Sequence, residues 1–340
     1  MTALAFGVSA RVGSLRYDEG IAAARVETAV APGVTSVRIV LPRELREEAA
    51  PGDEATVQLR GEDGGFVQVF RGALVSVTRA TAGSTILSTD ASGELASCRP
   101  GASYDQRTAK GIIQALARDA GVAVGTIDID LPLVGYIADQ RRTAWEHIAR
   151  IAGWSGGIAR TDAEGRLVVT PSPSAPAALA LRYGREIASL RVAARRGTVG
   201  GRLAFAGSGP AAGAEASDAR VQTTATLPEK LEQPGPSLVR VAAQALRTPA
   251  AASAATAAAR RASTDRLYAE CWLVPAIRAG VTIEIADAPQ EHAQGPWLVT
   301  RAVHEVGPGP RGRTRIEATG LAAVGGGLLD AAIAAVGSLL

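Results

Sequence analysis

Short runs of alternating apolar and polar residues fill the first hundred positions of the chain. The clearest runs are Arg38–Pro42, Glu54–Leu59, Val67–Ala80 and Ser84–Ser92, and turns rich in Gly and Asp separate them. Alternation with a period of two is typical of half-buried strands, and strands at this spacing build a small barrel or sandwich. The pattern therefore predicts a β-unit over residues 1–100.

The hydrophobic period becomes helical over residues 101–176. Thr108 is the expected N-cap of one helix, and Thr143 and Glu146 have the capping-box spacing that starts a second. Gly153 is expected just past the end of that second helix, because Gly adopts the left-handed conformation of a helix C-terminus at little cost. A predicted hairpin completes a small α/β module.

Strand patterns return over residues 177–320, and an Ala-rich helix interrupts them within about 236–264. Thr248 is its expected N-cap, and Pro249 suits the first helical position, where no intrahelical N–H is needed. The sequence thus predicts a mainly β protein with α/β insertions (α+β).

One pattern occurs twice. Gly52 leads into a short strand, a polar turn, a long strand near Phe70 and a further strand; Gly280 and Trp297 introduce the same series. The alternative is that any two β-meanders look alike at this level. A duplication is the simpler explanation, and it predicts two β-barrels of similar wiring. Three such chains around an axis would present six similar barrels.

Three segments follow one another in a recognisable order: APGDEATVQL…VFRGALVSVT…GSTILSTDAS, then TAKGIIQALARDAG…RRTAWEHIARIAGW, then RAGVTIEI…GPWLVTRAVHEV…RTRIEATG. In this order they resemble the late-control-D-type baseplate hub proteins of contractile phage tails and related injection systems, and the amino-terminal half of VgrG spike proteins. The resemblance implies two tube-type β-barrels, a small α/β module and a helical insertion in the second barrel.

The resemblance also implies a function without catalysis. Such a hub is a homotrimer whose barrels form a ring that joins the hexameric inner tube to the trimeric spike. The tape-measure protein and other baseplate components are further candidate partners. Assembly in the cytoplasm and incorporation into a virion tail or injection particle are expected. The chain ends soon after the second predicted barrel, so the spike is expected to be a separate polypeptide. The choice between phage tail, bacteriocin and cellular injection system stays open.

Composition bears on the rival functions. Only 4% of the residues are aromatic, which argues against a free-standing carbohydrate- or peptidoglycan-binding β-protein with aromatics exposed in a groove. A net charge of +3 gives little support for nucleic-acid binding. A tail-tip wall-degrading enzyme needs a paired acidic site, which the sequence does not reveal. Cys98 and Cys271 have no framework spacing and are expected to be free thiols.

The candidate chemical groups do not form a constellation. His147, His292 and His304 are far apart in sequence, and the residues around His147 do not match a HExxH zinc motif. Asp128 and Asp130 alternate with apolar residues, which places both on the solvent side of a strand. We therefore expect no catalytic residue, no cofactor site and no metal site.

The final segment, residues 321–340, is an apolar tail behind a Gly triplet at positions 325–327. It is too short and interrupted to span a membrane. A short helix there would carry an apolar stripe, and two uses of it are open: docking on the chain's own barrel, or contact with an axial neighbour. The candidate interface residues are Leu328, Leu329, Ile333 and Val336.

Overall fold

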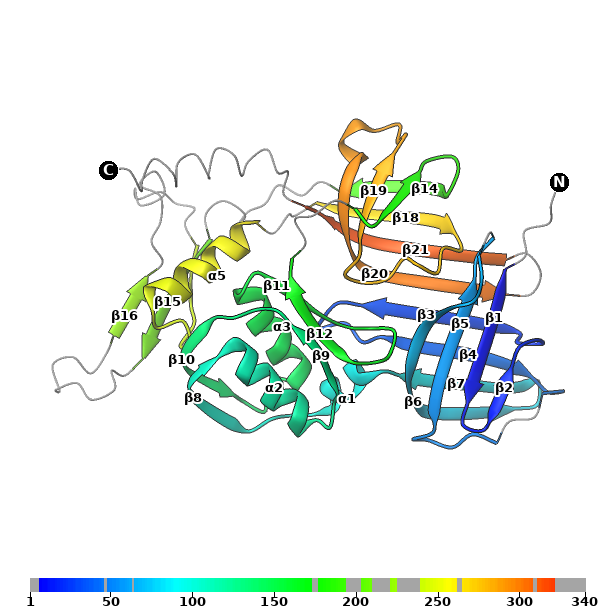
Figure 1. Cartoon of the computed structure of the whole chain (residues 1–340), viewed down its shortest axis with the longest axis horizontal. Coiled ribbons are helices and arrows are strands. Elements are labelled where there is room, and N and C mark those ends of the chain that lie inside the picture. The colour runs from blue at the N-terminus through cyan, green and yellow to red at the C-terminus, as the bar shows by residue number, and fades with distance from the viewer. Residues whose placement is uncertain are drawn as a thin grey trace.

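The computed structural model describes residues 6–45, 48–62, 64–172, 177–193, 203–209, 221–224, 239–261, 265–307 and 311–321. A 13-stranded sheet dominates it, and the α-helices lie to one side of this sheet together with short strands of smaller sheets (Figure 1). The fold is mainly β, as the alternating pattern predicted.

The first part of the sheet curls into a unit that we call the first half-barrel. Its inward residues form a core that includes Val26, Ile39, Leu59 and Phe70. In β4 every second residue is buried and the residues between are half-buried or exposed, because successive side chains of a strand point to opposite faces of the sheet. The strands are β1 Gly7–Val12, β2 Leu15–Tyr17, β3 Ala23–Ala29, β4 Ser36–Pro42, β5 Glu54–Arg60, β6 Val67–Ala80 and β7 Gly83–Thr89.

The α/β module follows. Thr108 caps α2, and Thr143 and Glu146 form the predicted capping box of α3. Its helices pack around Trp145 and Ile148, which are fully buried. The elements are α1 Ala91–Ser97, β8 Ala102–Thr108, α2 Ala109–Asp119, β9 Val124–Ile127, β10 Pro132–Ala138, α3 Ala144–Trp154, β11 Gly157–Thr161 and β12 Leu167–Pro171.

The second half-barrel contains β13 Leu179–Arg182, β14 Ile187–Ala193, β18 Arg266–Trp272, β19 Thr282–Ala286, β20 Gly295–Gly307 and β21 Arg311–Gly320. The short 3-10 helix η2 Glu291–Ala293 closes its core. Inserted between β14 and β18 are β15 Leu203–Gly209, β16 Val221–Thr224, β17 Val239–Ala242 and α5 Pro249–Arg261. Thr248 caps α5 as predicted, since its Oγ1 accepts the N–H of Ala251. Ala251 and Ala255 of α5 lie in the core of the α/β module.

The two half-barrels have the same wiring. Neighbours across the first are β3-β4-β7-β6-β5-β1, and across the second β14-β18-β21-β20-β19-β13. Each of these six strands in the first half-barrel therefore has an equivalent in the second, with the same place in the chain and in the sheet; β2, which pairs with β1, lies outside this correspondence. One pair differs, because β1 runs antiparallel to β5 whereas β13 runs parallel to β19.

The entry glycines are equivalent in detail. Gly52 and Gly280 have φ of 95° and 84°, a region that L-residues with side chains rarely adopt. The N–H of Gly52 donates to the carbonyl of Leu74 at 2.8 Å, and that of Gly280 donates to the carbonyl of Val299 at 2.8 Å. In both copies the register against the next strand shifts directly after the accepting residue. A glycine turn and a β-bulge thus form one local motif that the chain uses twice.

Two local predictions were wrong. The strand expected to run to Ser92 ends at Thr89, because the side chain of Asp90 accepts the N–H of Ser92 and starts α1. Gly153 lies inside α3 rather than after it. The left-handed residue behind that helix is Gly156, with φ of 70°.

Candidate assembly surface

The two half-barrels are joined by direct pairing of β3 with β20, which we call the seam. Residues Arg301–Val306 lie antiparallel to Ala24–Ala29. The first part of β20 pairs with β19 along the same edge, and the change of partner falls at the bulge. There the carbonyl of Thr300 accepts the N–H of Val30 at 3.0 Å. The seam makes one continuous sheet from the two units (Figure 1).

The buried side of the seam interlocks the two cores. Leu273 follows β18 of the second half-barrel, yet it is buried in the core of the first, as is Val306. The N–H of Ala279 donates to Oγ1 of Thr28 across the seam at 3.0 Å. Separating the half-barrels would expose these apolar side chains, so the pair behaves as one packed unit.

His304 fixes the loop behind β18 to this side of the seam. Its Nε2–H donates to the carbonyl of Ile277 at 2.9 Å, and its Nδ1 accepts from the Thr314 hydroxyl at 2.9 Å. That hydroxyl oxygen also accepts the N–H of Val274 at 3.0 Å. The pKa of His304 is lowered from 6.5 to about 4, mainly by burial; the hydrogen bond to Ile277 opposes this, and the charge of nearby Arg278 acts in the same direction as burial. The neutral ring is therefore the form that the fold holds.

On the opposite side of the sheet, arginines and glutamates alternate across β18, β21, β20 and β3. Burial alone would raise the pKa of Glu27, but a 2.7 Å hydrogen bond from Arg301 and the charge of that residue lower it. These side chains are partly exposed, so each pair contributes only about 0–1 kcal/mol. The network runs Arg313–Glu270–Arg315–Glu305–Arg25–Glu27–Arg301–Glu317.

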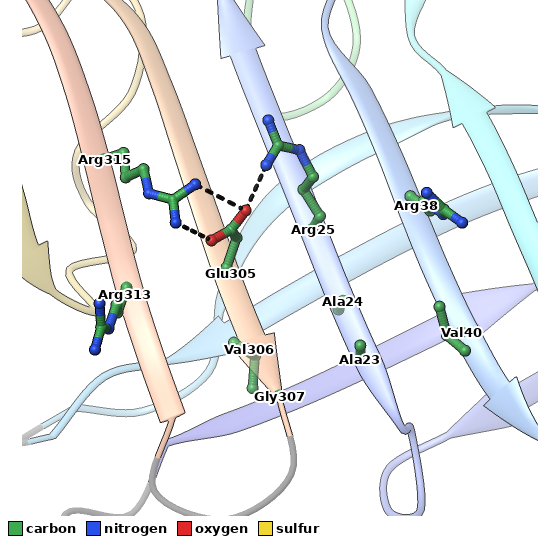
Figure 2. Close-up of a pocket in the computed structure, with 10 residues that line it drawn as sticks. All are labelled: Ala23, Ala24, Arg25, Arg38, Val40, Glu305, Val306, Gly307, Arg313 and Arg315. Atoms are coloured by element: carbon green, nitrogen blue, oxygen red, sulfur yellow. Dashed lines mark hydrogen bonds and ion pairs between the residues drawn. The ribbon is translucent and has the colours of Figure 1, made fainter.

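A groove of about 660 Å³ lies over the seam within this network. Figure 2 shows the Glu305 carboxylate held between Arg315 and Arg25, with Arg38 on the neighbouring strand. The small side chains of Ala23 and Ala24 also line it. The groove offers cationic hydrogen-bond donors, which suit contact with carboxylate or phosphate groups. Among its lining residues there is no nucleophile beside a general base.

The α/β module is anchored to the first half-barrel by the β11–β12 hairpin. The N–H of Ala31 donates to the carbonyl of Ala159 at 2.8 Å. The Thr161 hydroxyl donates to the carboxylate of Asp90. Burial raises the pKa of Asp90, although hydrogen bonds from Ser92 and Thr161 oppose this. The module is thus held by buried polar contacts as well as by packing.

Comparison with known proteins identifies the family to which the chain belongs. The sequence profile of the phage tail baseplate hub (GPD) family matches residues 32–309. The chain belongs to this family. The matched range includes the α/β module and the β20 side of the seam, whereas β3 precedes it. No curated protein sequence matches the chain.

Solved structures share the hub fold at low sequence identity. The 43 kDa tail protein of prophage MuSo2 from Shewanella oneidensis has a TM-score of 0.67 at 15% identity, covering 92% of this chain and 98% of its own. A tail protein from Neisseria meningitidis has a TM-score of 0.66 at 15% identity, covering 92% and 96%. A type VI secretion system component from E. coli has a TM-score of 0.57 at 10% identity, covering 91% and 76%.

The structure also places the candidate chemical groups of this hub protein. His147 and His304 are buried in different cores, and His292 lies on η2. Asp128 and Asp130 are both exposed, as predicted. Within the described ranges no three His, Cys, Asp or Glu residues come together as a metal site. In the same ranges no helix is long and apolar enough to cross a membrane. Cys98 and Cys271 are free, and burial raises the pKa of Cys271 to about 12.

The proposed tail contacts at Leu328, Leu329, Ile333 and Val336 lie outside the described residues. Sequence reasoning missed the seam network of the hub protein. A signal was present, since charged residues occupy alternate positions in RVE, RAVHE and RTRIE. Alternation of this kind marks one exposed face of a strand, but it does not say which strands are neighbours.

Proposed function

We propose that this hub-family protein is the structural adaptor of a contractile tail or injection particle, and that its role is assembly rather than catalysis. Three copies would form a ring of six half-barrels. One face of the ring would meet the hexameric inner tube and the other the trimeric spike. Assembly in the cytoplasm and incorporation into a virion tail or injection particle belong to the same proposal.

The observation that carries the proposal is the seam between two half-barrels of the same wiring. A tube with six-fold symmetry needs six equivalent contact surfaces, whereas a trimeric spike offers three. A chain that carries two like units in one continuous sheet can satisfy both with three copies. The shared core of Leu273 and Val306 supports this, because it holds the two units at a fixed angle.

The test is native mass spectrometry of the purified chain, alone and with candidate tube and spike proteins. We expect a mass of three copies, and complexes with both partners that retain three copies of this chain. A chain that stays monomeric and binds neither partner would contradict the proposal.

The C-terminal residues from Leu328 to Val336 are proposed to contact an axial partner such as the spike. Truncation at Gly325 should then weaken spike binding while leaving the ring intact. Unchanged assembly of spike and tube after truncation would assign this segment to the chain's own surface.

A further inference from the structure

Among the strand edges of the described sheet that have no neighbour are those of β14 and of the second half of β6. β14 is the last strand at its end of the 13-stranded order. The second half of β6 pairs with β7 on one side, but β5 covers the other side only as far as Ala73. At this edge Val75 is 49% exposed. Open edges of this kind invite pairing with another chain.

The duplication shows which strand of the other half-barrel corresponds to each of these two edges. In the first half-barrel, Leu74 lies opposite Ser88, Ser88 opposite Val37, and Val37 opposite Val26. In the second half-barrel, the equivalent Val299 lies opposite Ala318, Ala318 opposite Leu267, and Leu267 opposite Val192. Hence β14 is the counterpart of β3, and β6 is the counterpart of β20. β3 and β20 are the two strands that form the seam inside the chain.

We propose that β14 of one copy pairs with the second half of β6 in the next copy, which repeats the seam between chains. This rests on the proposed function, and it names the surface that would close the ring. His304 faces Val26 in the seam. By equivalence Arg79 would face Val192, and Ala80 would face Arg191. The contact joins two different edges, so it is head-to-tail and can close around an axis.

The direction of the backbone groups agrees with this register. The carbonyl of Thr300 points toward β3. Backbone groups of alternate residues in a strand point the same way, so those of Ala302 and His304 also point toward β3. Their counterparts Val77 and Arg79 therefore present N–H and C=O groups to the open edge of β6. On β14 the counterpart of Val26 is Val192, which does the same.

The contact between chains would lack part of what holds the internal seam. Ala80 stands where Glu305 pairs with Arg25, so that ion pair has no counterpart. Pro51 stands where the N–H of Ala279 reaches Thr28, and proline has no N–H to donate. The pairing between chains would depend on backbone hydrogen bonds and apolar packing. It would therefore be weaker than the seam and sensitive to the loss of one backbone N–H.

The test uses proline at one residue of each edge. Arg79→Pro removes an N–H that faces the open edge of β6, and Val192→Pro does the same on β14. Arg79→Ala and Val192→Ala are matched controls that lose the side chain but keep the N–H. By native mass we expect each proline variant alone to be monomeric and each alanine control to be trimeric, with circular dichroism unchanged. A mixture of the two proline variants should give a one-to-one dimer, because one intact edge remains on each.

A cysteine pair tests the register without proline, in case a proline variant fails to fold. Directly opposed residues of a non-hydrogen-bonded pair have Cα atoms about 4.5 Å apart, which permits a disulfide. The chain with Ala80→Cys and Arg191→Cys should form covalent trimers on oxidation, whereas Ala80→Cys alone should not.

The outcomes separate the two proposals. A folded Arg79→Pro or Val192→Pro variant that remains trimeric, or a trimeric double-cysteine chain that does not cross-link, overturns the edge pairing and leaves the hub function standing. A wild-type chain that is monomeric even with tube and spike proteins overturns both.

Discussion

Replacing His304 with Gln should remove a large part of the loss of stability at acidic pH. His304 is fully buried, and it holds the carbonyl of Ile277 and the hydroxyl of Thr314 at once. Protonation would place a second N–H against that hydroxyl, which already accepts from Val274. A Gln amide can still donate to the carbonyl but does not gain a proton in this range.

The magnitude follows from the pKa, which falls from 6.5 in the unfolded chain to about 4 in the fold. A depressed folded pKa means that the contribution is fully present above pH 6.5 and is lost as the pH falls toward 4. Each pKa unit corresponds to about 1.4 kcal/mol, so His304 accounts for about 3 kcal/mol of stability between these limits.

The assay is urea unfolding at pH 7.5 and at pH 4, for wild type and for His304→Gln. The variant should be less stable at neutral pH because it loses one hydrogen bond, yet its stability should fall by about 3 kcal/mol less on acidification. His292→Gln, on the exposed η2 helix, is the control and should keep the wild-type dependence. An unchanged acid loss in His304→Gln would refute the assignment.

Three further substitutions test the packing and the local motifs by thermal or urea unfolding. Leu273→Ala should cost about 3 kcal/mol, because it opens a cavity in the core of the other half-barrel; a loss below about 1 kcal/mol would mean that the seam is loosely packed. Gly52→Ala and Gly280→Ala should each cost about 1 kcal/mol for the left-handed backbone. Gly280→Ala should cost more, since its Cβ would lie 2.3 Å from Cδ of Arg160, and equal losses would show that Arg160 moves freely. Thr143→Ala should cost about 1 kcal/mol and Thr143→Ser little, unless the capping box contributes nothing.

Local signals in the sequence were sufficient for much of the fold. The caps at Thr108, Thr143 and Thr248 were predictable because a cap involves only residues within one helical turn. The duplication was also visible in the sequence, because glycine occurs at positions 52 and 280, where the backbone beside each bulge takes a positive φ. The helix α1 was missed because the alternating strand pattern runs without a break up to Asp90, the residue that caps this helix.

The sequence by itself determined several strands of each half-barrel, which face of those strands is apolar, and that one arrangement of strands occurs twice. It could not determine that β3 pairs with β20, because the hydrogen bonds of a ladder come from the backbone, which nearly every residue supplies. Arg25 and Glu305 are 280 positions apart, and nothing local to either one names the other. Only the curvature of the two half-barrels brings those edges together, and the same folded geometry leaves β14 and the second half of β6 open to another chain.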